Sequence, residues 1–188
     1  SSAGAFAVGW LETSLPSFAH SVVVQRVDSS GALIGSRFVV VSDGVDNIVT
    51  QPQVALDGQG RLIATWLEVP SSGGESRLLK MRRFNIDNTP SGGIVTLSNR
   101  ADGRAGALAA DNVGRVVAMV TEPTSGQPNS NIVTKVVNQN LGVVTTLTKT
   151  QAASPARQLA VAMTPDTGEF LTIVGDGQHF FTTSHSAT

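Results

Sequence analysis

Apolar residues recur along this chain in short runs that each begin just after a glycine. Gly4, Gly60, Gly114 and Gly168 lie 56, 54 and 54 residues apart, and the segments that they open read GAFAVGWLE, GRLIATWLE, GRVVAMVTE and GEFLTIVGD. Internal periods of about 50 residues are typical of arrays built from one supersecondary unit. The pattern therefore predicts four copies of one structural unit.

One repeat holds four short segments with strand-like composition. In the repeat that begins at residue 51 they read QPQVALD, RLIATW, RLLKMRRF and GIVTLS. The turn Asp57–Gly60, a loop rich in Pro, Ser and Gly, and a turn between Asp87 and Gly93 separate them, which is typical of antiparallel hairpins. Four strands in about 54 residues match one blade of a β-propeller.

The second strand of each repeat is apolar at consecutive positions instead of alternate ones. A strand of this kind has both of its faces covered. Blades stacked around an axis supply that cover, because each sheet then lies between two neighbours. An immunoglobulin-like sandwich is the alternative, but it does not need a repeat of this length.

The repeat phase divides the single segment 1–188 into a partial blade 1–50, blades 51–103 and 104–154, and a partial blade 155–188. We expect an all-β, propeller-like fold of four-stranded antiparallel blades. Its repeats, about 3.5 in number, would form an open arc or part of a larger propeller. Open faces and strand edges promote aggregation. We therefore expect self-association, or the remainder of a longer parent chain, to cover them; a compact four-bladed ring is the alternative.

The first repeat also carries a recognisable motif, GAFAVGW followed by VVVQRVDSSGALIG. It resembles a tandem repeat of bacterial secreted and surface-attached proteins, in which an apolar strand ending in Trp precedes Gln-Arg-Phe-Asp-x-x-Gly. The matching residues are Gln25, Arg26, Asp28, Gly31 and Gly35. The second repeat keeps Trp66 and MRRFN, whereas the third has Val120 and KVVNQN. The resemblance implies a propeller-type architecture, adhesin-like binding modules and an extracellular or cell-surface location, but no catalytic residue.

Composition narrows the possible functions. The net charge is −1 and only 14% of the residues are charged, so a nucleic-acid partner is not expected. Cysteine is absent, which removes disulfides, thiolate nucleophiles and cysteine metal sites. No apolar run reaches the ~20 residues of a membrane span, and the first 20 residues lack the pattern of a signal peptide. The three histidines are isolated, so we expect neither a metal site nor a cofactor.

One acidic column survives in all four repeats, two residues after the Trp or Val that ends the second strand. Its members are Glu12, Glu68, Glu122 and Asp176. The loops that follow would emerge on one propeller face, where carboxylates could bind a cation or a polyhydroxylated ligand. The alternative is that each carboxylate is solvated or accepts turn amides, and that duplication repeated it. Four carboxylates on separate blades would lie too far apart to share one ion.

The loops behind this column vary in content although they start from equivalent positions, as recognition loops on a scaffold do. Together with the loops between blades they would form one binding face, and a plain solvated surface is the alternative. The charged residues expected on this face, besides the acidic column, are Asp43, Asp46, Arg100, Asp102 and Arg104.

Two further groups favour structural roles. Trp10 and Trp66 occupy a column that becomes Val in the other repeats, which favours packing between blades over ligand stacking. The basic cluster around Arg82 and Arg83 lies on the third strand, where we expect a solvated outer strand whose charges protect the edge from pairing.

Three functions follow in order of preference. The first is an extracellular binding or scaffold module that recognises a protein or glycan through loops on one face. The second is a structural building block that completes a propeller with other copies or with the rest of a longer chain. The third is a glycan hydrolase that pairs two carboxylates, with Glu68 and Glu122 or the Asp residues between blades as candidates. No catalytic motif is present, and the absence of tyrosine excludes a tyrosine nucleophile of the sialidase kind, so we expect no enzyme.

Overall fold

The computed structural model describes residues 4–44, 46–72, 77–101, 106–124, 130–150, 158–175 and 180–186. The elements in these residues are fourteen β-strands, which form four antiparallel sheets. The all-β class predicted from the sequence is therefore confirmed. Asp102, Arg104 and Asp176, which we expected on the binding face, lie outside the described residues.

Each sheet is a meander in which consecutive strands pair side by side. Sheet I consists of β1 (Phe6–Ser14), β2 (Ala19–Val27) and β3 (Leu33–Ser42). Sheet II consists of β4 (Asn47–Leu56), β5 (Leu62–Pro70), β6 (Arg77–Phe84) and β7 (Pro90–Ala101). Sheet III consists of β8 (Gly106–Ala110), β9 (Val116–Pro123), β10 (Ser130–Val137) and β11 (Val143–Thr150). Sheet IV consists of β12 (Gln158–Met163), β13 (Phe170–Gly175) and β14 (Phe180–His185).

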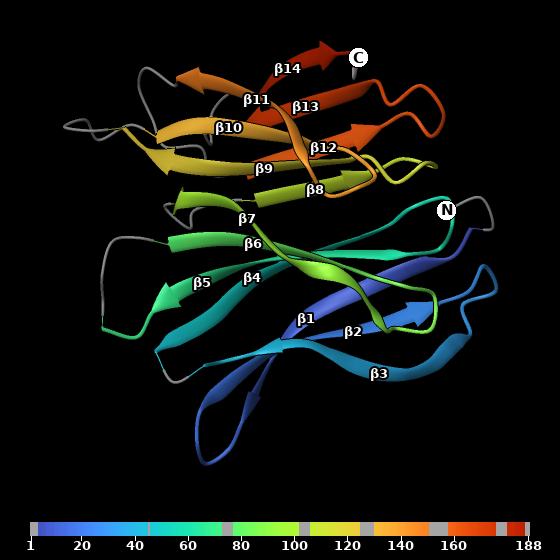
Figure 1. The fold of residues 1–188 in the computed structure, drawn as a ribbon, viewed down its shortest axis with the longest axis vertical. Coiled ribbons are helices and arrows are strands. Elements are labelled where there is room, and N and C mark those ends of the chain that lie inside the picture. Colours follow the sequence, from blue (N-terminus) through green and yellow to red (C-terminus); the bar gives the residue numbers. More distant parts are fainter. Residues whose placement is uncertain are drawn as a thin grey trace.

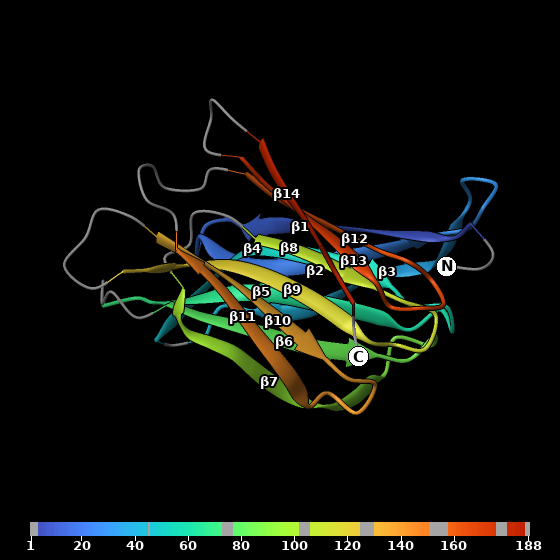
Figure 2. The ribbon, with the colours of Figure 1, turned by 90° about the horizontal axis from the view of Figure 1, so that it is seen from above.

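The four sheets stack face to face in sequence order. Figure 1 shows sheet I at the bottom of the stack and sheet IV at the top, along the longest axis of the molecule. Figure 2 looks along this stack and shows that the strand directions rotate from one sheet to the next. Sheets I and IV therefore lie at opposite ends, and the stack is open.

The same tight turn closes successive hairpins at one end of the stack, which we call the turn end. In the turn 57–61, the Asp57 carboxylate accepts hydrogen bonds from the amides of Gln59 and Arg61 at 3.0 and 2.9 Å. The fourth residue, Gly60, has a φ of +74°, which glycine adopts without steric cost. In three other turns, one side chain likewise accepts hydrogen bonds from the amides two and four residues later in sequence; these side chains are Asp28, Asp111 and Asn138. The opposite end, which we call the loop end, holds the β1–β2 loop and Asp43, which follows β3.

Alternate residues of the second strand of sheet II pack against different neighbours. Leu62, Ala64 and Trp66 join a core with the sheet I residues Val22 and Val24. The intervening Ile63 and Leu67 belong to a second core with sheet III, which includes Val116, Ala118 and Val120. This strand is thus covered on both faces, as its continuous apolar sequence predicts, and Trp66 packs between sheets.

Replacing Trp66 and Trp10 by alanine should lower the free energy of unfolding by different amounts, because only Trp66 is fully buried. Trp66 is 0% exposed, so Trp66→Ala leaves a cavity and should lower the free energy of unfolding by about 3–5 kcal/mol. Trp10 is half-buried, and Trp10→Ala should cost less than half as much. Urea unfolding at low protein concentration measures both values. Equal losses would contradict the packing described here.

Candidate functional site

The acidic column lies inside strands. Glu12, Glu68 and Glu122 pair in register with Ser21, Leu78 and Asn131 of the adjacent strands. The expectation that the second strand ends two residues earlier is therefore wrong, because ladder pairing continues past the Trp or Val. These carboxylates are not positioned on recognition loops.

Two of the described carboxylates of the column, Glu12 and Glu68, have a partner within their own sheet. Glu12 forms an ion pair with Arg37 of the same sheet. Glu68 accepts a hydrogen bond from the Trp66 indole at 3.2 Å and lies 3.9 Å from the Lys80 ammonium. Among the described residues, no three His, Asp or Glu side chains gather closely enough to hold a metal ion.

The third carboxylate of the column links two sheets. Glu122 accepts a hydrogen bond at 2.5 Å from the hydroxyl of Ser98, which lies on the outer strand of sheet II. The same hydroxyl accepts the Arg100 amide at 3.1 Å. The described part of the column therefore consists of carboxylates that are engaged within or between sheets.

Asp43, one of the charged residues expected on the loops between blades, connects sheets I and II. Its carboxylate accepts hydrogen bonds from the amide of His20 at 2.8 Å and from the amide of Val49 at 2.7 Å. It also lies 3.0 Å from His20 Nδ1. Burial raises the pKa of Asp43, but these hydrogen bonds and the His20 side chain together hold it below the ordinary 3.8. Asp46 and Arg100 are exposed.

The depressed pKa gives Asp43 a pH-dependent contribution to stability. The unfolded chain binds the proton more tightly than the folded one, so the contribution is present above pH ~4 and is lost as pH falls through the folded pKa. Urea unfolding of the wild type and of Asp43→Asn should therefore show a gap in stability at pH 6 that narrows below pH ~4. A gap that stays constant with pH would contradict this assignment.

Two buried arginines join neighbouring sheets at the turn end. Arg26, on the last part of β2, donates to the carbonyl oxygens of Gly60 and Asn85 at 2.6 and 2.8 Å. Its Nε donates to the Asn88 side-chain oxygen at 2.7 Å. All three acceptors belong to the two tight turns of sheet II. One side chain of sheet I therefore holds both of these turns.

Arg83 repeats this arrangement one sheet further along. It donates to the carbonyl oxygen of Gly114 at 2.6 Å and to that of Gln139, which belong to the two tight turns of sheet III. Burial lowers the pKa of Arg83, and the nearby Arg61 adds to this effect. The prediction of a solvated strand is therefore wrong for Arg83, which is 3% exposed.

The first turns of sheets II, III and IV also stack on one another. The Asp57 carboxylate accepts a hydrogen bond from the Nε of Arg61 at 2.7 Å. The Arg61 guanidinium lies over Gly114 of the next turn, and a side chain at position 114 would collide with it. Asp111 and Arg115 repeat this contact over Gly168. The recurrence of Asp-x-x-Gly-Arg at 57–61 and 111–115 is the sequence signal that could have identified this ladder.

The two arginine sites differ at one acceptor. The position of Asn88 is occupied in sheet III by Leu141, and Arg83 Nε is buried without a hydrogen-bond partner among the described residues. Leu141 also has a φ of +68°, a region that Asn tolerates better than Leu. The Arg83 site is therefore a less complete copy of the Arg26 site.

Leu141→Asn should supply the missing acceptor and relieve the backbone. We expect the free energy of unfolding to rise by about 1 kcal/mol, because a charge-assisted hydrogen bond and a favourable φ together outweigh the lost apolar contact. Leu141→Ala is the matched control and should lower stability. Thermal unfolding measures both variants, and a loss in Leu141→Asn as large as in the control would refute the assignment.

The outward face of sheet I is apolar and open. Phe6 and Val8 are 49% and 47% exposed, whereas the equivalent residues of sheet II, Leu62 and Ala64, are fully buried. Trp10 extends this face, at the position that Trp66 occupies in sheet II. We call the surface formed by Phe6, Val8, Trp10, Leu33 and Val39 the sheet I face.

Sheet IV has a second open face on the opposite side of the stack. It is formed by residues that share register positions across the three strands, and we call it the sheet IV face: Ala160, Ala162, Leu171, Ile173, Gly175 and Phe180. Leu171 and Phe180 are 41% and 72% exposed. Large apolar patches of this kind mark interaction surfaces in soluble proteins.

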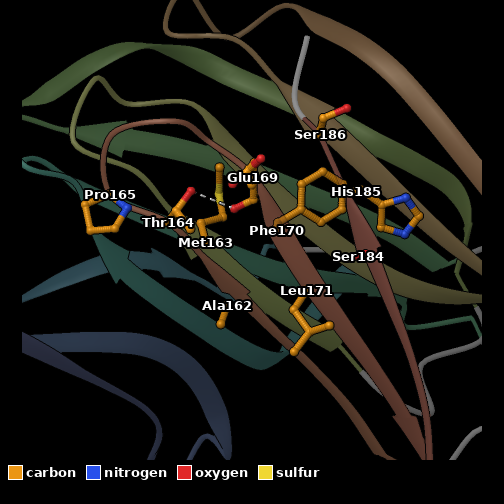
Figure 3. Close-up of a pocket in the computed structure, with 10 residues that line it drawn as sticks. All are labelled: Ala162, Met163, Thr164, Pro165, Glu169, Phe170, Leu171, Ser184, His185 and Ser186. Atoms are coloured by element: carbon orange, nitrogen blue, oxygen red, sulfur yellow. Dashed lines mark hydrogen bonds between the residues drawn. The ribbon is translucent and has the colours of Figure 1, made fainter.

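A cavity of about 610 Å³ lies at the turn-end edge of sheet IV. Figure 3 shows that Ala162 and Leu171 border it on one side, and that Phe170 and His185 lie together on the other. The Phe170 and His185 rings stack with centroids 4.8 Å apart. Glu169 is the only carboxylate in the described lining, and it accepts a hydrogen bond from Thr167 at 3.2 Å. The lining has the residues of an apolar contact surface and no paired acid and base.

No family model matches the chain, and no curated protein matches it. Among solved structures, it is similar to a protein described as Hadza microbial sialidase Hz136, with a TM-score of 0.63 and 13% sequence identity. The match covers 97% of this chain and 42% of that protein, so the chain spans less than half of its length. At this identity the likeness concerns the fold alone. The described residues include no helix of a length and hydropathy suited to crossing a lipid bilayer.

Proposed function

We propose that this chain is a structural arc of a β-propeller, completed by further sheets that pack against its two open faces. The observation that carries the proposal is the contrast between equivalent residues. Leu62, Ala64 and Trp66 are 0% exposed because sheet I covers them, whereas in sheet I the counterparts Phe6 and Val8 are exposed and Trp10 is only half-buried. Burying such a face yields roughly 25 cal/mol per Å² of apolar surface.

The structural likeness supports this proposal. Nearly all of the chain aligns with less than half of the similar sialidase chain, so a fold of this kind can be one part of a longer chain. Sheets I and IV have three strands in the described residues, whereas sheets II and III have four. Open strand edges invite pairing, so a further strand on each of these sheets would protect them, and further sheets would cover the faces.

A second function, an extracellular or cell-surface binding module, is favoured by the loop end of sheet I. The β1–β2 loop presents two large apolar side chains to solvent, since Leu15 is 78% and Phe18 is 67% exposed. Exposed apolar residues on a loop that leaves a rigid sheet suit recognition of a protein or glycan. This role uses the loop, whereas the first one uses the sheet faces; the loop projects below sheet I, on the side of its open face (Figure 1).

A glycan hydrolase is the weaker alternative. The name of the similar structure points to sialosides as substrates to test, but Glu68 and Glu122 each have a partner that occupies the carboxylate. Release of sugar from a glycan, lost in Glu68→Gln or Glu122→Gln, would support this third function. We expect no release.

The arc proposal predicts that the isolated chain self-associates through its two open apolar faces. Size-exclusion chromatography with light scattering should give a mass above 19.5 kDa, and dilution should increase the binding of an apolar dye. The double variant Phe6→Ser and Val8→Thr should reduce both signals while keeping the β-sheet circular dichroism spectrum.

Ile86→Thr is the matched control, because it removes an exposed apolar side chain at a turn outside both open faces. It should leave mass and dye binding unchanged. A chain that stays at 19.5 kDa at all concentrations and binds no dye would refute the proposal.

A further inference from the structure

We infer that the sheet IV face of one copy binds the sheet I face of a second copy, head to tail. This inference rests on the proposed function and names the partner that covers the open faces. It follows from a packing rule that the chain applies at every contact between its own sheets.

The rule is that alternate residues of a second strand face opposite neighbours. In β9, Val116, Ala118 and Val120 pack against sheet II. The intervening Val117 and Met119 pack toward sheet IV, where they meet Phe170 and Val174. Each sheet therefore has a face of one kind toward its predecessor and a face of the other kind toward its successor.

The two open faces are of opposite kinds. Phe6, Val8 and Trp10 occupy the register positions that face a predecessor in sheets II and III. Leu171 and Ile173 occupy the positions that face a successor. Contact between the sheet IV face and the sheet I face thus continues the existing interface, whereas contact between two identical faces has no counterpart within the chain.

Side-chain size also fits this pairing. Within the chain, the bulky Trp66 packs in one core with the small Ala7 of sheet I. The adjacent Gly9 lets β1 approach β4 closely, since any side chain there would meet Val54. On the sheet IV face, the exposed small residues Ala160 and Ala162 of β12 are open to receive bulky ones. The sheet I face supplies three: Phe6, Val8 and Trp10.

Neither face would bury an unpaired charge. The charged residues at the edge of the sheet I face are Glu12 and Arg37, which form an ion pair with each other. Among the described residues, the sheet IV face carries the neutral Gln158, Thr182 and Ser184, and its one charged neighbour is Glu169 at the turn-end edge, which accepts a hydrogen bond from Thr167. Since an isolated buried charge is costly, the position of these charges at the edges makes the contact feasible.

A head-to-tail contact is heterologous and closes into a ring if the rotation allows. Each copy contributes four sheets, so two copies with two such contacts make a ring of eight. β-Propellers typically have 4–8 blades, and a two-copy ring falls within that range. A ring of this kind leaves neither face exposed.

Disulfide trapping tests the inference directly, because the chain has no cysteine of its own. Val8→Cys and Ile173→Cys are prepared separately, one with a mass tag, mixed in equal amounts and oxidised. We expect nearly all of the linked dimer to contain one chain of each kind, whereas random encounter would give half. Phe6→Cys with Leu171→Cys is the second pair, used if the first misfolds or is out of register.

The control pair, Ile86→Cys with Ile173→Cys, should not exceed random linkage, because Ile86 lies in a tight turn of sheet II. A particle heavier than one chain that yields only links between identical variants, or no link with either pair, would overturn the head-to-tail contact while leaving the arc proposal intact. A monomer without dye binding would overturn both.

Discussion

The structure depends on one constraint, which is that the second strand of each repeat is apolar on both of its faces. Such a strand is stable only between two other sheets, so the unit that folds is a stack and not a single hairpin sheet. Trp66 shows the constraint satisfied, with 0% exposure between sheets I and II. Trp10, at the equivalent position of sheet I, shows it unsatisfied within the chain. The open faces are therefore a direct consequence of the repeat that builds the core.

Apolar contact brings the sheets together, but polar contacts fix how they are placed. Arg26, near the end of β2, and Arg83, near the end of β6, each join one sheet to two turns of the next sheet. Because both guanidinium groups are buried, losing these hydrogen bonds would cost free energy. The equivalent position in sheet III is Val136, which cannot donate. A cavity of about 360 Å³, lined in part by Val136 and Phe170, opens between sheets III and IV. The contact that lacks the arginine is thus the less completely packed one.

The sequence predicted the strands and their cover well, because hydrophobic period and turn residues are local signals. It failed where the decisive partner is distant. Arg83 looked solvated because charge usually means exposure, yet its acceptors, Gly114 and Gln139, lie 31 and 56 residues away in sequence. The acidic column looked like a binding site because repetition suggested a shared role. Ser98, the partner of Glu122, lies in another sheet, and no local pattern could reveal it.

The turn end and the loop end of the stack differ in function, and this separation makes a scaffold role compatible with a binding role. At the turn end, Asp57 and Asp111 hold repeated turns in register, so substitutions there change how sheets stack. At the loop end, Asp43 and Glu122 also link neighbouring sheets, whereas the exposed Leu15 and Phe18 can vary without disturbing the core. A ring assembled through the faces would array such loops on one side. Recognition at the loop end would then gain from assembly, because each added copy brings a further set of loops to the same surface.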